Sequence, residues 1–349
     1  MIRRLAAGVL LASGSVAALA AEVSDPAQVL AKMSKAAREV NYQGVIVYQT
    51  RNRLDTLKVV HGVHDGVELE RVKTLTGTPS EIVKRDGKVM CILPKDRQMT
   101  LDRPTPKGLF PTLTPERLQQ ISSVYHFESI GTTRIAGRPC EGISIMPRDE
   151  FRYGYQIWAD QQTMVPLKVN LVSRNGAVLE QMMFTEVEFP EQIPESAFEV
   201  DAHPEPGQRI VRAEEQGPRP PEAVPQPRDW RFTRLPPGFK VTMRDVRPTP
   251  DGKGIVEHIL ISDGLSAISV FSARMHAPAG QSFEGQSQMG AVHAFGRIVG
   301  TIHVTVVGEA PPETVRLIGE SVEPDDAQVG PVEADLASKP AEAPAAAQP

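Results

Sequence analysis

The sequence lacks the residue patterns of the common catalytic and cofactor sites. No glycine-rich phosphate loop is present, because Asp251 to Gly254 (DGKG) is an ordinary turn between strands. Ser266 and Ser287 lie near glycines, but neither stands in the GxSxG pattern of a nucleophile elbow. His61 and His64 are the nearest histidine pair, and in a strand their spacing points the rings to opposite faces. We therefore expect no catalytic residue, no metal site and no cofactor.

Basic patches and long apolar segments are also missing. The net charge is −5, and six acidic side chains but one lysine fall within residues 323–349. No stripe of lysine and arginine predicts a nucleic-acid partner. Beyond the N-terminus, no stretch approaches the ~20 apolar residues that cross a bilayer.

The first 21 residues have the pattern of a secretory signal peptide. Arg3 and Arg4 precede an apolar run from Leu5 to Leu19, and small residues predict cleavage near Ala20 or Ala21. No cysteine stands at this exit to accept a lipid anchor. The sequence therefore predicts a soluble protein exported to the periplasm, with an uncleaved membrane anchor as the alternative.

Cysteine occurs only twice. Cys91 and Cys140 lie far apart in strand-like segments and form no CxxC pair. Because an exported protein meets an oxidising compartment, we predict a disulfide between Cys91 and Cys140, with two buried free thiols as the alternative. A bond closing a loop of that length would stabilise the fold by roughly 3 to 4 kcal/mol in the chain-entropy model.

Residues 22–200 predict an antiparallel sheet with helices on one face. Ser24-Asp25-Pro26 starts a helix whose apolar stripe ends near Val40, and Thr114-Pro115-Glu116 starts a second, short helix. The other segments alternate with period two, which predicts strands joined by turns such as Asp65-Gly66. A long sheet must curl around its helices to cover its apolar face, so the expected fold is an α+β protein with an N-terminal half-barrel.

A second, smaller unit follows a proline-rich segment. Residues 201–229 hold seven prolines among charged and small residues, which is typical of an extended linker. Residues 230–322 predict a small α+β domain that closes with a helix from about Pro311. The tail, residues 323–349, is too poor in large apolar residues to fold. The following residues are expected to pack the second domain or its junction with the first: Trp230, Phe232, Leu235 and Phe239.

A curled sheet can enclose more space than its own side chains fill, and an apolar cavity then takes an apolar ligand. Methionines 33, 90, 99, 164, 182 and 183 suit a pocket for acyl chains, although filling an irregular core is the simpler explanation. The inward-facing candidates for lipid contact are Val45, Val47, Met90, Ile92, Ile157, Leu167, Val169 and Leu171.

Two kinds of surface are candidates for a partner. The basic side chains Arg228, Arg231 and Arg234 could meet an acidic partner or a lipid phosphate, and a solvated face is the alternative. A strand edge of the second domain could also accept a partner peptide, although such edges are normally shielded.

Five segments, in order, carry a family resemblance. They are NYQG before VIVY, GYQIWAD with MVPLK, WRFTRLPPGFKVT, SDGLSAISVF and HVTVVGEAPPETV. Their order and spacing, from about Asp25 to Glu320, resemble the RseB/MucB family of periplasmic regulators of the sigma-E (AlgU) envelope-stress response. The resemblance implies an N-terminal domain similar to the lipoprotein carriers LolA and LolB, and a negative regulator with no reaction of its own.

The resemblance also implies a partner. Such a protein binds the periplasmic part of a RseA/MucA-type anti-sigma factor and shields it from the site-1 protease until lipid or lipopolysaccharide signals release it. The second domain would supply much of that binding surface, and homo-oligomers are common in the family. The alternative is a periplasmic lipid or lipoprotein carrier of LolA type, which leaves the linker and the second domain without a role. A hydrolase would need a serine, histidine or metal essential for turnover.

Overall fold

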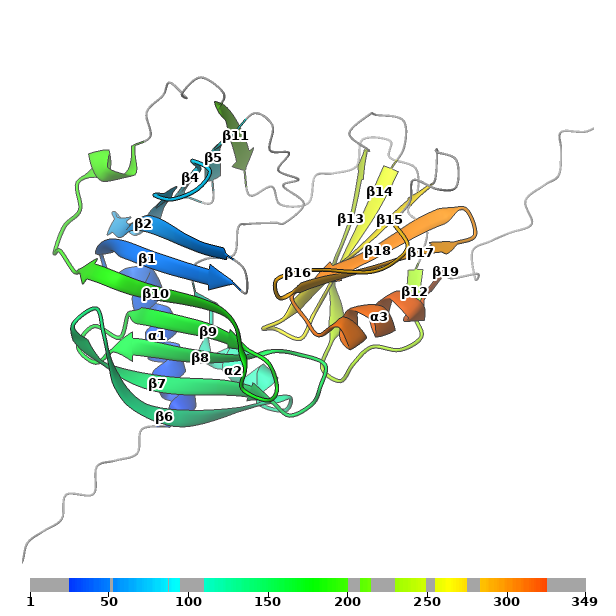
Figure 1. Cartoon of the computed structure of the whole chain (residues 1–349), viewed down its shortest axis with the longest axis horizontal. Coiled ribbons are helices and arrows are strands. Elements are labelled where there is room, and N and C mark those ends of the chain that lie inside the picture. Colours follow the sequence, from blue (N-terminus) through cyan, green and yellow to red (C-terminus); the bar gives the residue numbers. More distant parts are fainter. Residues whose placement is uncertain are drawn as a thin grey trace, which may run out of the picture.

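The computed structural model describes residues 25–50, 53–86, 88–94, 110–199, 208–214, 230–248, 255–274 and 283–324. These residues form two domains, and each is built on one antiparallel sheet with few helices (Figure 1). The longest helix has 14 residues, and no helix in the described part of the chain is both long and apolar enough to span a membrane. The predicted signal peptide, Met99, Arg228 and residues 325–349 lie outside the described residues.

The N-terminal domain holds an eleven-stranded sheet in the order β11-β5-β4-β3-β2-β1-β10-β9-β8-β7-β6. β6 and β10 contact each other although three strands separate them in this order, so the sheet is curled. Its strands are β1 (Tyr42–Thr50), β2 (Arg53–His64), β3 (Val67–Thr74), β4 (Glu81–Arg85), β5 (Lys88–Pro94), β6 (Tyr125–Ile135), β7 (Arg138–Pro147), β8 (Gly154–Asp160), β9 (Pro166–Val172), β10 (Val178–Glu188) and β11 (Gln208–Glu214).

Two helices lie on the concave face of this sheet (Figure 1). α1 (Pro26–Glu39) begins where the carboxylate of Asp25 accepts a backbone N–H of the first turn at 3.1 Å. α2 (Pro115–Ile121) begins in the same way at the hydroxyl of Thr114, at 3.3 Å. Both starts confirm the predicted caps. The buried apolar residues of α1 are Val29, Leu30, Met33, Ala36 and Ala37.

β11 lies inside the segment expected to be a linker. It pairs with β5 from Gln208 opposite Pro94 to Glu214 opposite Lys88, and so forms one edge of the N-terminal sheet. The prolines counted over residues 201–229 all lie outside residues 208–214, where the sequence is QRIVRAE. Because no proline interrupts it, this stretch can form a ladder of backbone hydrogen bonds. These residues belong to the sheet, which corrects the expectation of a continuous linker.

The C-terminal domain has a six-stranded sheet in the order β13-β14-β15-β18-β17-β16. α3 (Pro312–Ser321) packs on β17 and β18, and β12 (Trp230–Phe232) pairs with β19 (Val322–Pro324). Trp230 and Phe239 are buried in this domain's core, and Phe232 and Leu235 pack against it, which confirms their predicted role. The sheet strands are β13 (Lys240–Pro248), β14 (Ile255–Ser262), β15 (Ala267–Arg274), β16 (Gly285–Met289), β17 (Val292–Val299) and β18 (Ile302–Gly308).

The predicted disulfide is not formed. Cys91 on β5 and Cys140 on β7 are both free and buried, and seven strands separate β5 from β7 in the sheet order. The prediction of a bond is therefore wrong, and the alternative of two buried thiols holds. Burial raises the pKa of both thiols, that of Cys140 to about 11 with a further contribution from the charge of Asp160. Both groups therefore stay protonated and unreactive near neutral pH.

Candidate functional site at the domain seam

The two domains meet at a seam that buries charged side chains. The fully buried guanidinium of Arg152, in the loop between β7 and β8, donates from Nη1 to Oδ2 of Asp263 at 2.6 Å. Asp263 lies in the turn between β14 and β15, so this ion pair joins the two domains. The hydroxyl of Tyr125 also donates to Oδ2 of Asp263, at 3.0 Å. Burial and the charge of Asp263 raise the pKa of Tyr125, which keeps the donor proton in place.

Every side of the Arg152 guanidinium is occupied. Nε and Nη2 each donate to the carboxylate of Asp149 at 3.0 Å, and Nη2 also donates to the carbonyl oxygen of Pro237. The rings of Tyr125 and Phe239 lie 5.5 and 4.8 Å from its central carbon. A buried charge is tolerated only when it is paired and hydrogen-bonded, and here each domain contributes one carboxylate. Separating the domains would take Asp263 away from Arg152, which would keep Asp149 of its own domain.

The β14–β15 turn is shaped to enter the N-terminal domain. Oδ1 of Asp263 accepts the backbone N–H of Leu265 at 2.8 Å and that of Ser266 at 2.7 Å. Gly264 has a φ of 103°, and a Cβ there would lie 3.0 Å from Cγ2 of Ile121 on α2. Leu265 packs against the core of the N-terminal domain. The SDGLS segment is therefore a docking turn, and Ser266 is a structural serine, as expected.

A second set of contacts lies at the other end of the seam. Glu180 on β10 accepts the backbone N–H of Ala291 through Oε1 at 3.3 Å and the hydroxyl of Tyr48 through Oε2. Tyr153 and Leu171 form a small buried cluster with Ala291. Burial, with the charges of nearby glutamates, raises the pKa of Tyr153 to about 12. The seam thus extends from α2 to the β16–β17 turn.

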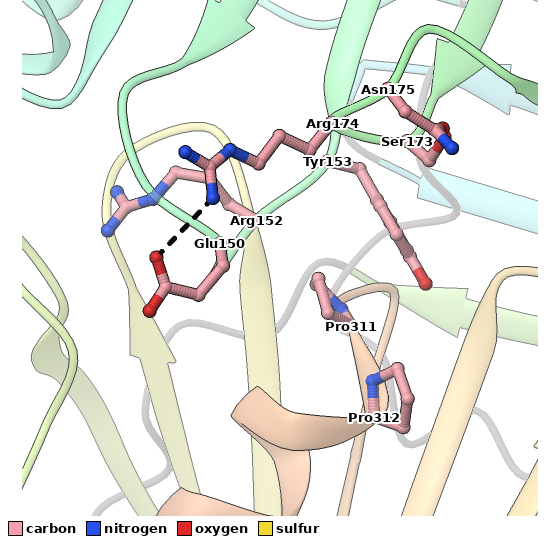
Figure 2. Close-up of a pocket in the computed structure, with 8 residues that line it drawn as sticks. All are labelled: Glu150, Arg152, Tyr153, Ser173, Arg174, Asn175, Pro311 and Pro312. Carbon is pink, nitrogen blue, oxygen red and sulfur yellow. Dashed lines mark hydrogen bonds and ion pairs between the residues drawn. The ribbon is translucent and has the colours of Figure 1, made fainter.

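A cavity of about 560 Å³ opens on the seam beside Arg152. Figure 2 shows the ion pair of Glu150 and Arg174 on one side and the ring of Tyr153 reaching toward Pro311. Glu150 and Arg174 are both exposed, so the rim is charged while the wall is largely apolar. The volume lies within the range of small-ligand sites. The residues lining it are Glu150, Arg152, Tyr153, Ser173, Arg174, Asn175, Pro311 and Pro312.

Half of the eight predicted lipid-contact residues lie on the concave face. Ile157, Leu167 and Val169 are buried in the core that packs on α1, and Leu171 follows them on the same face, in the seam cluster with Ala291. Four of the six methionines belong to this core or its margin, namely Met33, Met164, Met182 and Met183.

The inward orientation predicted for Val45, Val47, Met90 and Ile92 is wrong. On β1 the buried residues of the concave face are Tyr42 and Ile46, so Val45 and Val47 point to the other face. The concave face continues from Val59 on β2 through the paired residues Val72, Ile82 and Cys91. Met90 and Ile92 therefore point to the other face, where Ile92 is buried. An error of one residue in the alternation moves a whole strand pattern to the wrong face.

The predicted basic residues do not form a cluster among the described residues. Arg231 makes an exposed ion pair with Glu323 across β12 and β19 at 3.1 Å, and Arg234 is exposed. His61 is buried, its Nδ1 lies 2.9 Å from the carbonyl oxygen of Val40, and its ring stacks on that of Tyr42. No group of three potential metal ligands occurs in the described part of the chain.

The sequence contains no pattern that marks the seam residues Arg152, Asp263, Tyr125 and Glu180. Tyr125 and Glu180 lie in strands and Arg152 and Asp263 in turns. The hydrogen bonds that Asp263 and Ala291 make to the N-terminal domain join residues more than 100 positions apart. The one available signal is the SDGLS segment, because an aspartate followed by glycine and serine predicts a side chain that caps its own turn.

Family models match both domains that form this seam. Residues 25–202 match the model described as MucB/RseB N-terminal domain, and residues 224–323 match that described as MucB/RseB C-terminal domain. The chain belongs to the MucB/RseB family. Arg152 therefore comes from one family domain and Asp263 from the other, so their ion pair joins the two halves of a MucB/RseB protein.

Curated and structural relatives span most of the chain. It is 31% identical to the sigma factor AlgU regulatory protein MucB of Pseudomonas aeruginosa, over 91% of this chain and 97% of that protein. It is 27% identical to the sigma-E factor regulatory protein RseB of Escherichia coli, over 89% and 95%. The solved structure "Crystal structure of MucB in complex with MucA(peri)" is 28% identical with a TM-score of 0.67, covering 86% of this chain and 99% of that chain. These MucB/RseB relatives are named as regulatory proteins, and the family is not enzymatic.

Proposed function

We propose that this protein is a periplasmic negative regulator of an envelope-stress sigma factor of the sigma-E (AlgU) kind. It binds the periplasmic segment of a RseA/MucA-type anti-sigma factor and shields that segment from the site-1 protease. The observation that carries the proposal is the likeness, along both domains, to MucB in its complex with the periplasmic part of MucA. The names of the AlgU and sigma-E regulatory relatives agree with it.

The domains have separate roles in this proposal. Residues 1–21 direct export, residues 22–200 form a lipid-sensing domain of LolA/LolB type, and residues 230–322 contribute to the anti-sigma surface. Since β11 is paired with β5, residues 208–214 move with the N-terminal domain and are not part of a linker between the domains. Glu323 and Pro324, expected to belong to the unfolded tail, lie in β19, and the rest of the acidic tail, residues 325–349, has no assigned role.

The seam supplies the coupling that a lipid switch needs. A ligand shifts an equilibrium only as far as it binds one state better than the other, and moving a population from 1:99 to 99:1 takes about 5.5 kcal/mol. Burying an acyl chain releases ~0.8 kcal/mol per CH₂, so part of one chain is enough. Leu171 lies on the concave face and also packs with Ala291 of the other domain. A chain bound along Leu167, Val169 and Leu171 would therefore reach the seam and weaken it.

The buried contacts between the domains favour a regulator over a lipid carrier. A carrier of LolA type needs only the N-terminal domain, yet here the C-terminal domain places Asp263 and Leu265 against the N-terminal core. Leu265, in the turn that Asp263 caps, buries apolar surface against the N-terminal core, so the two domains are built to act together.

A binding titration tests the proposal. The purified protein is titrated by calorimetry with the periplasmic segment of a RseA/MucA-type anti-sigma factor, with and without lipopolysaccharide, and the same mixtures are challenged with the site-1 protease. We expect tight binding and protection, both weakened by the lipid. Leu171→Ala should reduce the lipid effect, whereas Val47→Ala, on the opposite face, should not. Absence of binding under both conditions would reject the regulator and leave the carrier.

A further inference from the structure

The cavity on the seam has a cation and an anion at its rim that make only a loose contact. Nη1 of Arg174, in the turn between β9 and β10, lies 3.8 Å from Oε2 of Glu150, in the loop between β7 and β8. This distance is longer than a hydrogen bond, and neither side chain makes a hydrogen bond within the described residues. Exposed pairs of this kind stabilise a fold very little. Both groups can therefore receive charges from a ligand.

The second arginine of the cavity is not available to a ligand. The donors of Arg152 are already taken by two aspartates and a backbone carbonyl oxygen. Arg174 is therefore the available cation among the described residues that line the cavity. Beside it, Oδ1 of Asn175 accepts hydrogen bonds within its own turn, which leaves the two N–H donors of this amide. A guanidinium beside neutral N–H donors suits a phosphate.

The surroundings of the cavity also carry an excess of negative charge. Burial and the charges of three glutamates raise the pKa of Tyr153, whose ring lines the cavity. These glutamates are Glu313, Glu309 and Glu180. Glu150 adds a further carboxylate at the rim. A phosphate alone would meet this excess of carboxylates, whereas an ammonium group joined to the phosphate would be attracted to them.

The wall of the cavity suits the apolar part of a lipid close to its headgroup. It consists of the ring of Tyr153 and of Pro311 and Pro312, at the start of α3 (Figure 2). Tyr153 also packs with Leu171, the last of the residues proposed to contact an acyl chain. The volume of about 560 Å³ is that of a whole small ligand rather than of an ion. A lipid bound along the concave face would therefore place its headgroup at this cavity.

We propose that the cavity binds the headgroup of a zwitterionic phospholipid of the phosphatidylethanolamine type, with its phosphate at Arg174 and its ammonium group at Glu150. Complementary charge selects this class, because the headgroup brings one anion and one cation to an arginine and a glutamate that lie next to each other. A phosphatidylglycerol headgroup has the phosphate without the ammonium group, so Glu150 would repel it. The path of the acyl chain rests on the proposed function, whereas the headgroup site does not.

A titration with short-chain lipids tests the headgroup site by itself. The purified protein is titrated by calorimetry with dihexanoyl phosphatidylethanolamine and with dihexanoyl phosphatidylglycerol, both below the concentrations at which they form micelles. We expect the ethanolamine lipid to bind about ten-fold more tightly. Arg174→Met should weaken its binding about ten-fold, because a charged hydrogen bond to the phosphate is lost. Glu150→Gln should bring the two lipids to similar affinity.

Arg231→Met is the matched control for these variants. It breaks another exposed ion pair, that with Glu323, which lies outside the cavity. This variant should bind both lipids as the unchanged protein does. The inference is overturned if the unchanged protein does not bind the ethanolamine lipid or binds both lipids equally. It is also overturned if Arg174→Met and Glu150→Gln leave both affinities unchanged.

Binding of the anti-sigma segment without lipid separates this inference from the proposed function. Arg174→Met and Glu150→Gln should bind the segment as the unchanged protein does. If the unchanged protein does not bind the segment but keeps the lipid preference, the regulator is rejected and the headgroup site stands. If the segment binds but the lipid preference is absent, only the headgroup site is rejected. Loss of segment binding in both variants would also overturn the inference, because the cavity would then hold the partner's peptide.

Discussion

Two buried aspartates, Asp160 and Asp263, each accept hydrogen bonds from an arginine. Arg138 binds Asp160 through Nε at 2.8 Å and Nη2 at 3.1 Å, and Thr163 donates to it from both its backbone N–H and its hydroxyl at 2.9 Å. Asp160 thereby holds the turn in which Met164 has a φ of 63°, a conformation that non-glycine residues rarely adopt. One carboxylate therefore fixes the turn between β8 and β9.

The ion pair of Asp160 with Arg138 should stabilise the fold at neutral pH and lose this effect in acid. Burial acts to raise the pKa of Asp160, but the bonds from Arg138 and Thr163 outweigh it and lower the pKa below its usual value. A group whose folded pKa is depressed stabilises the fold above its unfolded pKa, about 3.9, and loses that contribution as the pH falls through the folded pKa.

We therefore expect Arg138→Met to reduce the free energy of unfolding by about 1 to 3 kcal/mol at pH 7, because a charged hydrogen-bond partner of Asp160 is lost. Urea unfolding at pH 7 and pH 3 should show the difference shrink at the lower pH. Arg174→Met, which breaks the exposed pair with Glu150, should cost less than about 1 kcal/mol. An equal loss for Arg138→Met at both pH values would contradict the assignment.

The two buried thiols predict a simple chemical result. Without any reductant, a thiol reagent should find two free cysteines per chain in denaturant and almost none in the folded protein, because Cys91 and Cys140 are buried and their pKa values are raised. Finding no thiol in denaturant would mean that the cysteines are bonded and that β5 and β7 lie together.

At the scale of the elements, helices were easier to predict than the faces of strands. Asp25 and Thr114 are followed by proline and an apolar stripe, and this local chemistry sets where α1 and α2 begin. Successive side chains of a strand point to opposite faces of the sheet. Nothing within β1 or β5 shows which of the two sets faces inward, since Val45 and Met90 are as apolar as Ile46 and Cys91. Only the tertiary position of α1 selects the concave face.

The sequence does not predict β11, because the high proline content of residues 201–229 as a whole conceals the proline-free stretch from 208 to 214. We predict that it stabilises β5, its only neighbour in the sheet. Proline is introduced at Ile210 and, separately, at Val211; alternate residues of an edge strand bond to their neighbour, so one of these changes must remove a ladder hydrogen bond. Hydrogen exchange of Val89 to Ile92 should then accelerate, while that of β2 should not change.

Gln208→Pro is the matched control for this experiment, because the first residue of a strand tolerates proline. If both interior proline variants leave exchange in β5 as slow as in the unchanged protein, then β11 does not hold this edge.

For the whole molecule, the sequence predicts two units but not how they are joined. Arg152 and Asp263 are 111 positions apart, and neither has a local pattern that distinguishes it from a surface residue. Burial of an ion pair is decided by what surrounds it, here Tyr125, Phe239 and α2, and these come together only in the folded chain. The seam could therefore be found only from the structure.

If the seam joins the domains energetically, they should unfold together. Trp158 lies in the N-terminal domain and Trp230 in the C-terminal domain, and the chain has no other tryptophan. Replacing either one by phenylalanine leaves fluorescence from a single domain. In otherwise unchanged protein we expect both reporters to follow one urea transition.

Arg152→Met should separate these two transitions, because it leaves the Asp263 carboxylate buried without its charged partner, a loss of roughly 3 to 5 kcal/mol. Asp263→Asn should act in the same direction by weakening the partner of Arg152. The double variant should cost less than the sum of the single ones, because the second change removes a charge that the first has already left unpaired. Arg174→Met, beside the same cavity but exposed, should keep the transitions coincident. Coincident transitions in Arg152→Met, or strictly additive losses, would show that the apolar contacts of Leu171 and Leu265 hold the domains together without the ion pair.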